Sequence, residues 1–287
     1  MAETFRVGLI QNRAERDMAP SIAALEPMIR AAAKDGAHVI QLPEIATMLE
    51  PDNAAVLAKT KPEDQDPGLA KFRALAAELK RWILVGSLLI REKGRDKVVN
   101  RSFVLDPDGK IVARYDKIHL FDVEIKDGQM YRESATVEPG TRAVIAQLPW
   151  GRIGLSICYD LRFPHLYRAL AQAGADFLAI PSAFTRQTGV AHWETLLRAR
   201  AIENGAYVLA PAQCGLHDGG RGTWGHSMIV SPWGEVIAAA GEEPGIIMAT
   251  LDREKVREAR RMIPALSHDR PFEGPQSGAK PAKPVAA

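Results

Sequence analysis

The sequence predicts an α/β protein in which two similar strand–helix–strand halves form two sheets that pack face to face, with helices outside. Short apolar runs alternate with segments of helical periodicity along the 287 residues. Residues 6–9 (Arg-Val-Gly-Leu) resemble residues 152–155 (Arg-Ile-Gly-Leu), and residues 32–37, which precede one apolar run, resemble residues 170–175, which precede another. Because such units share a composition, a chance similarity of the two halves is the alternative interpretation.

The composition is ordinary for a protein with a full core, with 46% apolar and 25% charged residues. A net charge of +2 does not favour a nucleic-acid partner. No apolar run reaches the roughly 18 residues that a membrane span needs, and the N-terminal segment lacks the apolar stretch of a signal peptide. Two cysteines and no His/Cys cluster predict neither disulfides nor a metal site. We therefore expect a cytoplasmic protein without a membrane partner.

The first half is expected to begin with a strand–helix–strand unit. That order predicts adjacent parallel strands joined by a right-handed crossover. The expected elements are a strand at 5–11, a helix at 21–34 that ends before Gly36, a strand at 37–42, an amphipathic helix at 69–82, a strand at 83–90, and a hairpin of strands 98–105 and 110–115 around Asp106-Pro107-Asp108-Gly109. The stretch after this hairpin, at 116–122, has no periodicity and is interpreted as a charged loop.

The second half is organised around residues 154–164 (Gly-Leu-Ser-Ile-Cys-Tyr-Asp-Leu-Arg-Phe-Pro). The apolar run at 153–157 predicts a buried strand that ends at Cys158, and Pro164 opens a helical pattern. Open α/β sheets bind ligands at this edge, and backbone N–H groups with a helix dipole favour a thiolate and an oxyanion. A nucleophile is one interpretation of Cys158, and a buried structural thiol is the other.

The rest of the chain completes the second half and adds a tail. The expected elements are a helix opened by Pro164, a strand at 177–180, a helix at 192–204 that ends at Gly205, a strand at 207–210, a hairpin of strands 227–230 and 236–239, a strand at 245–251, and a helix at 253–262. Residues 1–270 are interpreted as one domain. The tail at 271–287 is rich in Pro, Gly, Lys and Ala, so we expect a flexible extension.

Three unlike groups are expected at strand ends or on adjoining loops: Glu44, Lys117 and Cys158. A carboxylate can act as general base for a thiol, and an ammonium can lower the thiol pKa and stabilise an oxyanion. The backbone N–H of Tyr159 is a natural second oxyanion donor. Together these groups fit acyl transfer by a thiol, followed by hydrolysis. Taken singly, Glu44 and Lys117 are more commonly solvated surface residues. The pattern alone does not show that the three side chains lie together.

A Cys–His pair is the competing catalytic arrangement, with His119, His192 or His226 as the base. The order of these residues along the chain leaves this alternative open. The second cysteine, Cys214, lacks the strand-to-helix turn and is interpreted as structural.

Three blocks of the sequence, residues 42–44 (Leu-Pro-Glu), 115–122 (Tyr-Asp-Lys-Ile-His-Leu-Phe-Asp) and 154–164, resemble in order and spacing the signature blocks of the nitrilase (carbon–nitrogen hydrolase) superfamily. The resemblance extends over about residues 4–270. It implies a catalytic triad of the glutamate, lysine and cysteine named above, a four-layer αββα sandwich, no cofactor or metal, and a homodimer or higher homo-oligomer. The family's second glutamate, which orients the lysine and the substrate, resembles Glu133.

Residues 181–203 and 212–215 resemble the branch of amidases that hydrolyse deaminated glutathione. Its near relatives are omega-amidases, which act on 2-oxoglutaramate and 2-oxosuccinamate. The resemblance implies that Arg162, Phe184 and Thr188 hold the 2-oxo-carboxylate end of the substrate, and a guanidinium fork suits a carboxylate.

The expected function is therefore hydrolysis of a small 2-oxo acid amide by a thiol amidase, with deaminated glutathione as the first candidate substrate. An omega-amidase that releases ammonia is the alternative, and a catalytically silent binding or scaffold protein is a third class. The homodimer is expected through helices near Cys158 and the helix at 192–204, whose Trp193, Leu196 and Leu197 could form an interface or an ordinary core face.

Overall fold

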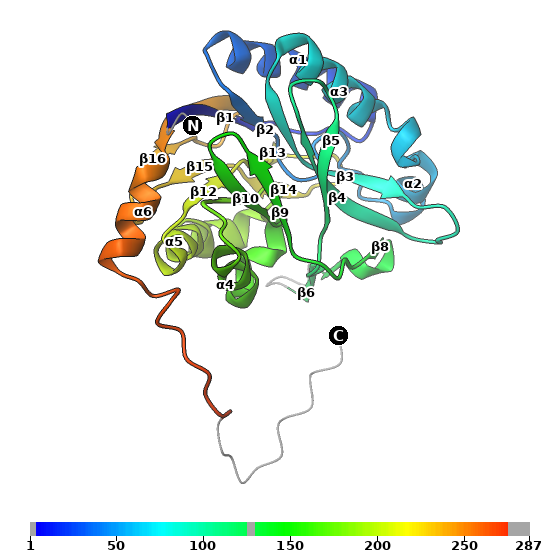
Figure 1. The fold of residues 1–287 in the computed structure, drawn as a ribbon. Coiled ribbons are helices and arrows are strands. Elements are labelled where there is room, and N and C mark those ends of the chain that lie inside the picture. The colour runs from blue at the N-terminus through cyan, green and yellow to red at the C-terminus, as the bar shows by residue number, and fades with distance from the viewer. Residues whose placement is uncertain (1–3, 125–129, 275–287) are drawn as a thin grey trace.

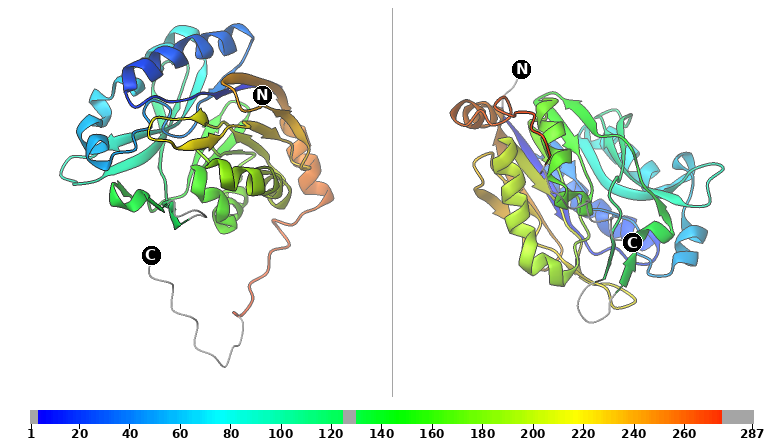
Figure 2. Two further views of the ribbon diagram at one scale, coloured as in Figure 1. Left: turned by 180° about the vertical axis from the view of Figure 1, so that it is seen from behind. Right: turned by 90° about the horizontal axis from the view of Figure 1, so that it is seen from below.

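The computed structural model describes residues 4–124 and 130–274 of the chain. The chain forms four layers in the order helices, sheet, sheet, helices, so the predicted αββα sandwich is confirmed (Figure 1). Figure 2 shows the same layers from behind and from below. Helices α1 and α3 cover one outer face, and α4 and α5 cover the opposite one.

The first sheet has the strand order β17-β1-β2-β3-β4-β5, with the short β8 paired to β4. Its elements are β1 (Thr4–Gln11), α1 (Met18–Lys34), β2 (Val39–Gln41), α3 (Pro67–Leu79), β3 (Trp82–Arg91), β4 (Val98–Leu105), β5 (Ile111–Asp116), β8 (Val137–Glu138) and β17 (Gly245–Asp252). β1 is parallel to β2, as predicted. It is also antiparallel to β17, with residue pairs from Thr4↔Asp252 to Gln11↔Gly245, so the first and last strands of the fold are neighbours.

The second sheet has the strand order β16-β15-β12-β11-β10-β9. Its elements are β9 (Val144–Leu148), β10 (Gly151–Leu155), α4 (Pro164–Gln172), β11 (Phe177–Ala179), α5 (Arg186–Asn204), β12 (Tyr207–Ala210), β15 (Met228–Val230) and β16 (Val236–Ala239). Helix α6 (Arg253–Met262) follows β17.

The two halves repeat the same pairing, which confirms the predicted internal similarity. In each half two parallel pairs are followed by an antiparallel one: β1-β2-β3-β4 in the first and β10-β11-β12-β15 in the second. Gly8 and Gly154 occupy matching register positions. A Cβ on Gly8 would lie 3.3 Å from the Cβ of Ala32, and one on Gly154 would lie 3.0 Å from Leu170, so both glycines let a helix pack closely on its sheet.

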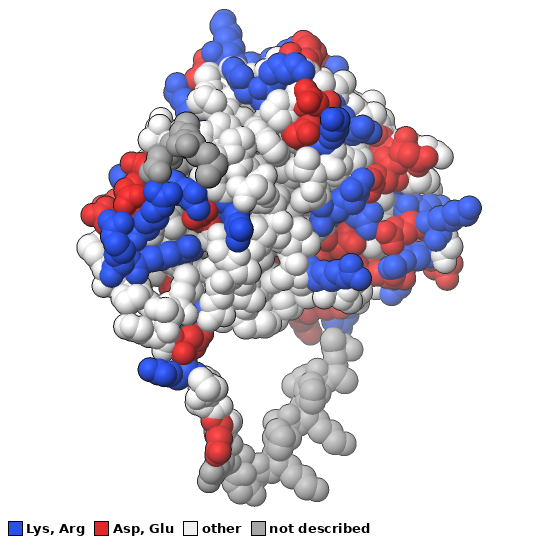
Figure 3. Space-filling view, viewed as in Figure 1, with Lys and Arg blue, Asp and Glu red and all other residues white. Residues whose placement is uncertain are grey.

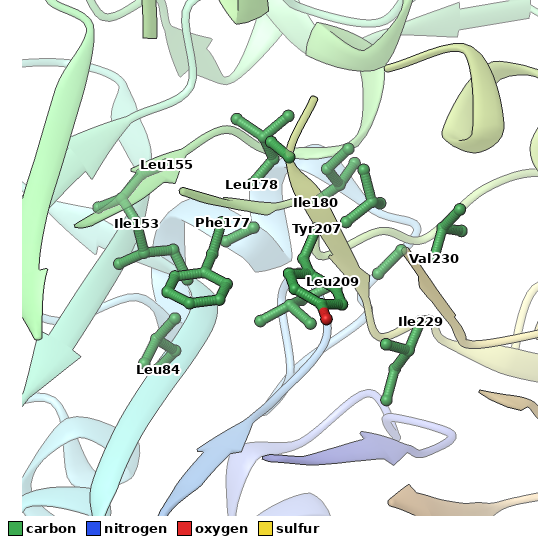
Figure 4. Packing of buried hydrophobic residues seen from close by; sticks show 14 of the residues in the cluster. Leu84, Ile153, Leu155, Phe177, Leu178, Ile180, Tyr207, Leu209, Ile229 and Val230 are labelled. Carbon is green, nitrogen blue, oxygen red and sulfur yellow. The ribbon is translucent and has the colours of Figure 1, made fainter. Parts of the chain in front are cut away.

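The main hydrophobic core lies between the two sheets. Leu84 of β3 packs in one cluster with Ile153 and Phe177 of the second sheet (Figure 4). A second cluster, which includes Leu25 and Phe72, fills the space between the first sheet and its helices. Buried apolar side chains on both faces of the first sheet explain why its strands have near-continuous apolar sequences.

Helix α5 begins at Arg186, whereas the sequence predicted a start at 192. Gly189 lies in the first turns of α5, although glycine is more typical of loops. Packing requires it there, because a Cβ at this position would lie 2.3 Å from the Trp224 side chain. The predicted interface residues Trp193 and Leu197 on α5 are 1% and 0% exposed, so they belong to the core.

The cysteine turn also differs from the prediction, because the five-residue 3₁₀ helix η4 (Cys158–Arg162) lies between β10 and α4. Several further short elements were not predicted: α2 (Asn53–Lys59), η1 (Glu63–Gln65), β6 (Asp122–Glu124), β7 (Met130–Arg132), η3 (Glu133–Ala135), β8, β9, β13 (Cys214–Leu216) and β14 (Gly222–Trp224).

On the face in Figure 3, Lys and Arg side chains are interspersed with Asp and Glu. Within the described ranges, no helix has both the length and the apolar character that a bilayer span requires. Residues 275–287 of the predicted tail lie outside the described residues, while 271–274 have neither helix nor strand and Phe272 is 88% exposed. The domain boundary at 270 stays a prediction.

Candidate active site

A cavity of about 510 Å³ lies where the carboxyl ends of β2, β5 and β10 meet. Glu44 follows β2, Lys117 follows β5, and Cys158 begins the 3₁₀ helix after β10. All three side chains line this cavity, together with Glu133 and Tyr159. The structure thus brings together all five residues that the sequence predicted as catalytic.

Lys117 lies at the centre of the site and is only 2% exposed. Its Nζ donates to Glu44 Oε1 at 2.8 Å and to Glu133 Oε1 and Oε2 at 3.0 and 2.8 Å. Burial alone would lower the pKa of Lys117, but Glu133 and Glu44 together raise it well above its usual value. The side chain is therefore a permanent buried cation.

Glu44 has a partner on each carboxylate oxygen. Oε1 accepts from Lys117 and from Asn100 Nδ2 at 3.1 Å, and Oε2 accepts from the Ala183 N–H at 2.8 Å. Burial would raise the pKa of Glu44, but Lys117, with a contribution from the neighbouring Cys158 thiol, outweighs it, and the pKa falls below its usual value. The carboxylate is ionised at neutral pH and available as a base.

The pKa of the Cys158 thiol shifts in the opposite direction. Burial raises it, and the Glu44 carboxylate raises it further, while Lys117 lowers it by a smaller amount. The predicted effect of the ammonium is present, since Lys117 lowers the thiol pKa, but burial and the adjacent carboxylate outweigh it. The site holds a neutral thiol beside an ionised glutamate.

The backbone at Cys158 has a φ of +49°, a conformation that side chains other than glycine rarely adopt. Ile45, next to Glu44, has a φ of +42°. Such positions cost on the order of 1 kcal/mol each and concentrate at functional sites. The Cys158 N–H donates to Pro181 O at 2.9 Å, whereas no backbone hydrogen bond among the described residues uses the Tyr159 N–H. Tyr159 therefore retains a donor beside the thiol.

Asp160 supports the cysteine turn, a role that was not predicted from the sequence. It is fully buried, and its Oδ2 accepts from the Ile157 N–H at 2.8 Å and the Tyr115 hydroxyl at 2.7 Å. Its Oδ1 accepts from the His119 N–H at 3.0 Å and lies 2.7 Å from His119 Nδ1. One carboxylate thus joins the cysteine turn to the loop that carries the lysine.

Asn100 of β4 was also missed. Its Nδ2 donates to both Glu44 Oε1 and Glu133 Oε1, at 3.1 and 3.2 Å, and its backbone oxygen accepts from the Lys117 N–H. A polar residue within the apolar strand Val98–Leu105 is the signal that could have identified it.

The geometry does not support the Cys–His alternative. His119 is held by Asp160 and stacks on Phe163 with ring centroids 3.6 Å apart. His192 contacts Arg162, and His226 stacks on Trp224. None of these three histidines is among the described residues that line the cavity.

The predicted substrate residues divide into two groups. Phe184 and Thr188 line the cavity. Arg162 is absent from its described lining: its guanidinium carbon lies 5.3 Å from the Phe184 ring centroid, and its Nη2 lies 3.3 Å from His192 Nδ1. A carboxylate-binding role of Arg162 stays a prediction that this arrangement does not support. The cavity is instead lined by Arg132 and Arg221, which the sequence analysis did not name.

Cys214 is fully buried and does not appear among the described lining residues. Burial raises its pKa to about 11. Both properties agree with a structural thiol. Within the described part of the chain, no group of three or more His, Cys, Asp and Glu side chains is arranged to hold a metal ion.

Comparison with known proteins gives consistent matches over nearly the whole chain. The model of the carbon–nitrogen hydrolase family matches residues 6–261. The chain is 40% identical over 273 residues to the deaminated glutathione amidase of Synechocystis sp., covering 92% of this chain and 97% of that protein. It is 37% identical over 272 residues to omega-amidase NIT2 of Bos taurus, covering 93% and 95%.

A solved structure shows the same likeness. The C. elegans NitFhit protein matches with a TM-score of 0.86 and 37% identity. The match covers 94% of this chain but 66% of that longer one.

Proposed function

The chain belongs to the carbon–nitrogen hydrolase family, and from that premise we propose that it hydrolyses an amide bond through an acyl-enzyme on Cys158. The observation that carries this proposal is the buried group of Glu44, Lys117 and Cys158 at one edge of the cavity. The chemistry follows from the protonation states: a neutral thiol, an ionised carboxylate and a fixed ammonium.

In the first step Glu44 removes the Sγ proton while Sγ attacks the amide carbon. The carbonyl oxygen becomes an oxyanion, which the Tyr159 N–H and the Lys117 ammonium stabilise. At rest Lys117 Nζ contacts three carboxylate oxygens, one of Glu44 and two of Glu133. When Glu44 gains the proton, its attraction for Lys117 weakens, so one N–H of the ammonium can turn to the oxyanion at that moment.

In the second step Glu44 transfers its new proton to the amide nitrogen. The C–N bond breaks, the amine leaves, and a thioester remains on Cys158. Glu44, ionised again, takes a proton from water, whose oxygen attacks the thioester carbon. Collapse of this second intermediate releases the acid, and the departing sulfur recovers its proton from Glu44. Glu133, which contacts Lys117 but carries no proton in these steps, acts as a positioning residue.

Deaminated glutathione is the proposed substrate, and its hydrolysis yields 2-oxoglutarate and cysteinylglycine. The support is the 40% identity to an amidase named for this substrate and a cavity whose volume, about 510 Å³, lies in the range of small-molecule sites. The second candidate is 2-oxoglutaramate, because the chain is also 37% identical to an omega-amidase.

Steady-state turnover of the two substrates side by side tests the proposal. We expect kcat/KM for deaminated glutathione to exceed that for 2-oxoglutaramate by more than about tenfold, which corresponds to roughly 1.4 kcal/mol of transition-state discrimination. Cys158→Ala serves as the blank, and it should abolish both activities. A reversed ratio would assign the protein to the omega-amidases, and turnover that survives in Cys158→Ala would exclude the thiol mechanism and leave a role that needs no catalytic cysteine.

We also propose that the protein is a homodimer. The apolar side chains of Ile202, Trp233 and Ile263 are each more than half exposed and line one cavity of about 230 Å³ beside α5 and α6. We expect light scattering to give twice the chain mass of 31.3 kDa, and Trp233→Glu to shift the mass toward the monomer. A monomer in the unmodified protein would contradict this proposal.

A cytoplasmic location is proposed from the chemistry, since the mechanism needs a reduced Cys158. Thiol trapping after cell fractionation checks it. Recovery of the protein in an oxidising compartment would overturn it.

A further inference from the structure

The cavity carries more positive charge than the proposed triad uses. Among the described residues, its charged lining residues are Glu44, Glu50, Lys117, Arg132, Glu133 and Arg221. Lys117 is paired with Glu44 and Glu133. Glu50 is paired with Arg16 and Lys59, at 2.7 Å each. The two remaining charges in the described lining are both arginines, so these two positions offer cations to an anionic group of a ligand.

Arg221 is the better placed of the two. Its Nη2 donates to the backbone oxygen of Ala183 at 2.8 Å, and its guanidinium carbon lies 5.5 Å from the Tyr131 ring centroid. Its Nε is buried and has no hydrogen-bond partner within the described structure. Because this Nε is closed off from the cavity, the donor left for a ligand is Nη1, which forms no hydrogen bond among the described residues and is not one of the buried polar atoms. A guanidinium fixed at two points is prepared to bind a further acceptor through that group. Arg132, by contrast, is exposed at the rim.

We propose that Arg221 determines substrate specificity by binding a carboxylate on the leaving-group side of the amide, such as the terminal carboxylate of a departing dipeptide. This inference rests on the proposed function and names the part of the substrate that the triad does not contact. The recognised class is an amide whose amine half ends in a carboxylate, and ammonia-releasing amides lack that group.

The position of Ala183 assigns Arg221 to this side of the cavity. The Ala183 N–H binds Glu44, and the oxygen of the same residue binds Arg221. In the proposed mechanism Glu44 protonates the departing nitrogen, so the amine half of the substrate must lie against Glu44. Arg221 also helps lower the pKa of Glu44, which agrees with a short separation. Next to it, Gly219 and Gly220 line the cavity without side chains and leave room for the amine half.

The test compares two ligands that differ only at the far end of the amine half. One is deaminated glutathione, and the other is the same compound with its terminal carboxylate converted to a carboxamide. Binding is measured by calorimetry in the Cys158→Ala background, where no turnover occurs. We expect the carboxylate ligand to bind at least about tenfold more tightly, and Arg221→Gln to remove that preference. Arg221→Lys keeps the positive charge but lacks the two-pronged guanidinium, so it should retain part of the preference for the carboxylate ligand.

Three results of this comparison would overturn the proposal. They are equal binding of the two ligands when Arg221 is present, a preference for the carboxylate ligand that survives in Arg221→Gln, and an equal loss of affinity for both ligands in that variant. Arg186→Gln is the matched control, because it removes one arginine that is paired with Glu242 at 2.7 Å and absent from the described cavity lining. It should leave the preference intact. A preference lost equally in this control would assign the effect to net charge and overturn the proposal.

Kinetics with the active enzyme provides a second readout. We expect Arg221→Gln to lower the ratio of kcat/KM for deaminated glutathione to that for 2-oxoglutaramate by at least about tenfold. An unchanged ratio would contradict the proposal. Failure of the proposed function can be told apart from failure of this inference. If the unmodified protein turns over neither substrate, the proposed function fails, but the binding experiment in the Cys158→Ala background still measures the preference for the carboxylate.

Discussion

Lys117→Met should both inactivate and destabilise the protein. The substitution removes the cation that Glu44 and Glu133 share, in a site where Lys117 is only 2% exposed. Removing one partner from a buried ion pair leaves charge without compensation, which costs about 3–5 kcal/mol of unfolding free energy. Loss of the oxyanion contact should lower kcat by roughly 10³-fold. Urea unfolding and steady-state kinetics measure the two effects.

The double variant Lys117→Met/Glu133→Gln separates stability from catalysis. It removes one of the two unpaired carboxylates, so we expect it to recover part of the lost unfolding free energy. It does not restore the cation, so kcat should remain as low as in the single variant. If activity returned together with stability, Lys117 would have a purely structural role.

Glu44→Gln should preserve the fold and abolish most of the activity. Lys117 keeps its pairing with Glu133 in this variant, and the oxygen of the new amide can still accept from Lys117 and Asn100. The NH2 group of the amide then faces the Ala183 N–H, so that one hydrogen bond is lost. The neutral Cys158 thiol, however, loses its base, and general acid–base catalysis contributes about 10²–10⁴-fold. We expect kcat to fall by that factor while the protein stays folded, with a lower thermal midpoint because one buried hydrogen bond and one ion pair are lost.

The pH profile identifies the role of Glu44 more specifically. The carboxylate must be ionised to act, and its pKa lies below the usual 4.5, so the activity of the unmodified protein should decline only below that pH. In Glu44→Gln the thiolate must form without a base. Burial still raises the pKa of the thiol there, although the contribution of the Glu44 carboxylate is gone, so the residual rate should increase with pH between pH 7 and 9. A flat residual profile would argue against this assignment.

Glu50→Gln is a matched control for Glu44→Gln. Glu50 also lines the cavity, but its carboxylate is held by Arg16 and Lys59. These partners hold its pKa at about 2, with the Arg16 hydrogen bond as the largest cause. The substitution should weaken stability and change kcat only a few-fold. A loss of kcat equal to that in Glu44→Gln would mean that any glutamate change in the cavity inactivates the protein.

The triad could be predicted because three sequence blocks, around Glu44, Lys117 and Cys158, resemble in order and spacing the signature blocks of a known superfamily. Their positions after strands agreed with that prediction, but the strand-end pattern alone did not show that the three side chains meet. The sandwich could be predicted for a related reason, since the repeated strand–helix–strand pattern reappears as matching pairings in both sheets.

Residues that act through long-range contacts could not be predicted in this way. Asp160 joins two loops, and Asn100 bridges two glutamates from inside a strand, so neither has a local signature. The same limit explains the two arginines. Arg162 is close to Cys158 in sequence yet is packed against Phe184, while Arg221 is distant in sequence and lines the cavity. The net direction of the Cys158 pKa shift could not be predicted either, because burial, its largest cause, is a property of the packed sandwich.

The pairing of β1 with β17 has a consequence for synthesis on the ribosome. Residues 4–11 emerge early, but their antiparallel partner at 245–252 is translated about 240 residues later. At about 5–20 residues per second, one edge of β1 stays open for roughly 10–50 seconds. An apolar strand with an unpaired edge invites intermolecular pairing. We therefore expect a chain that stops before residue 245 to aggregate more readily than the full chain, because it can never pair this edge.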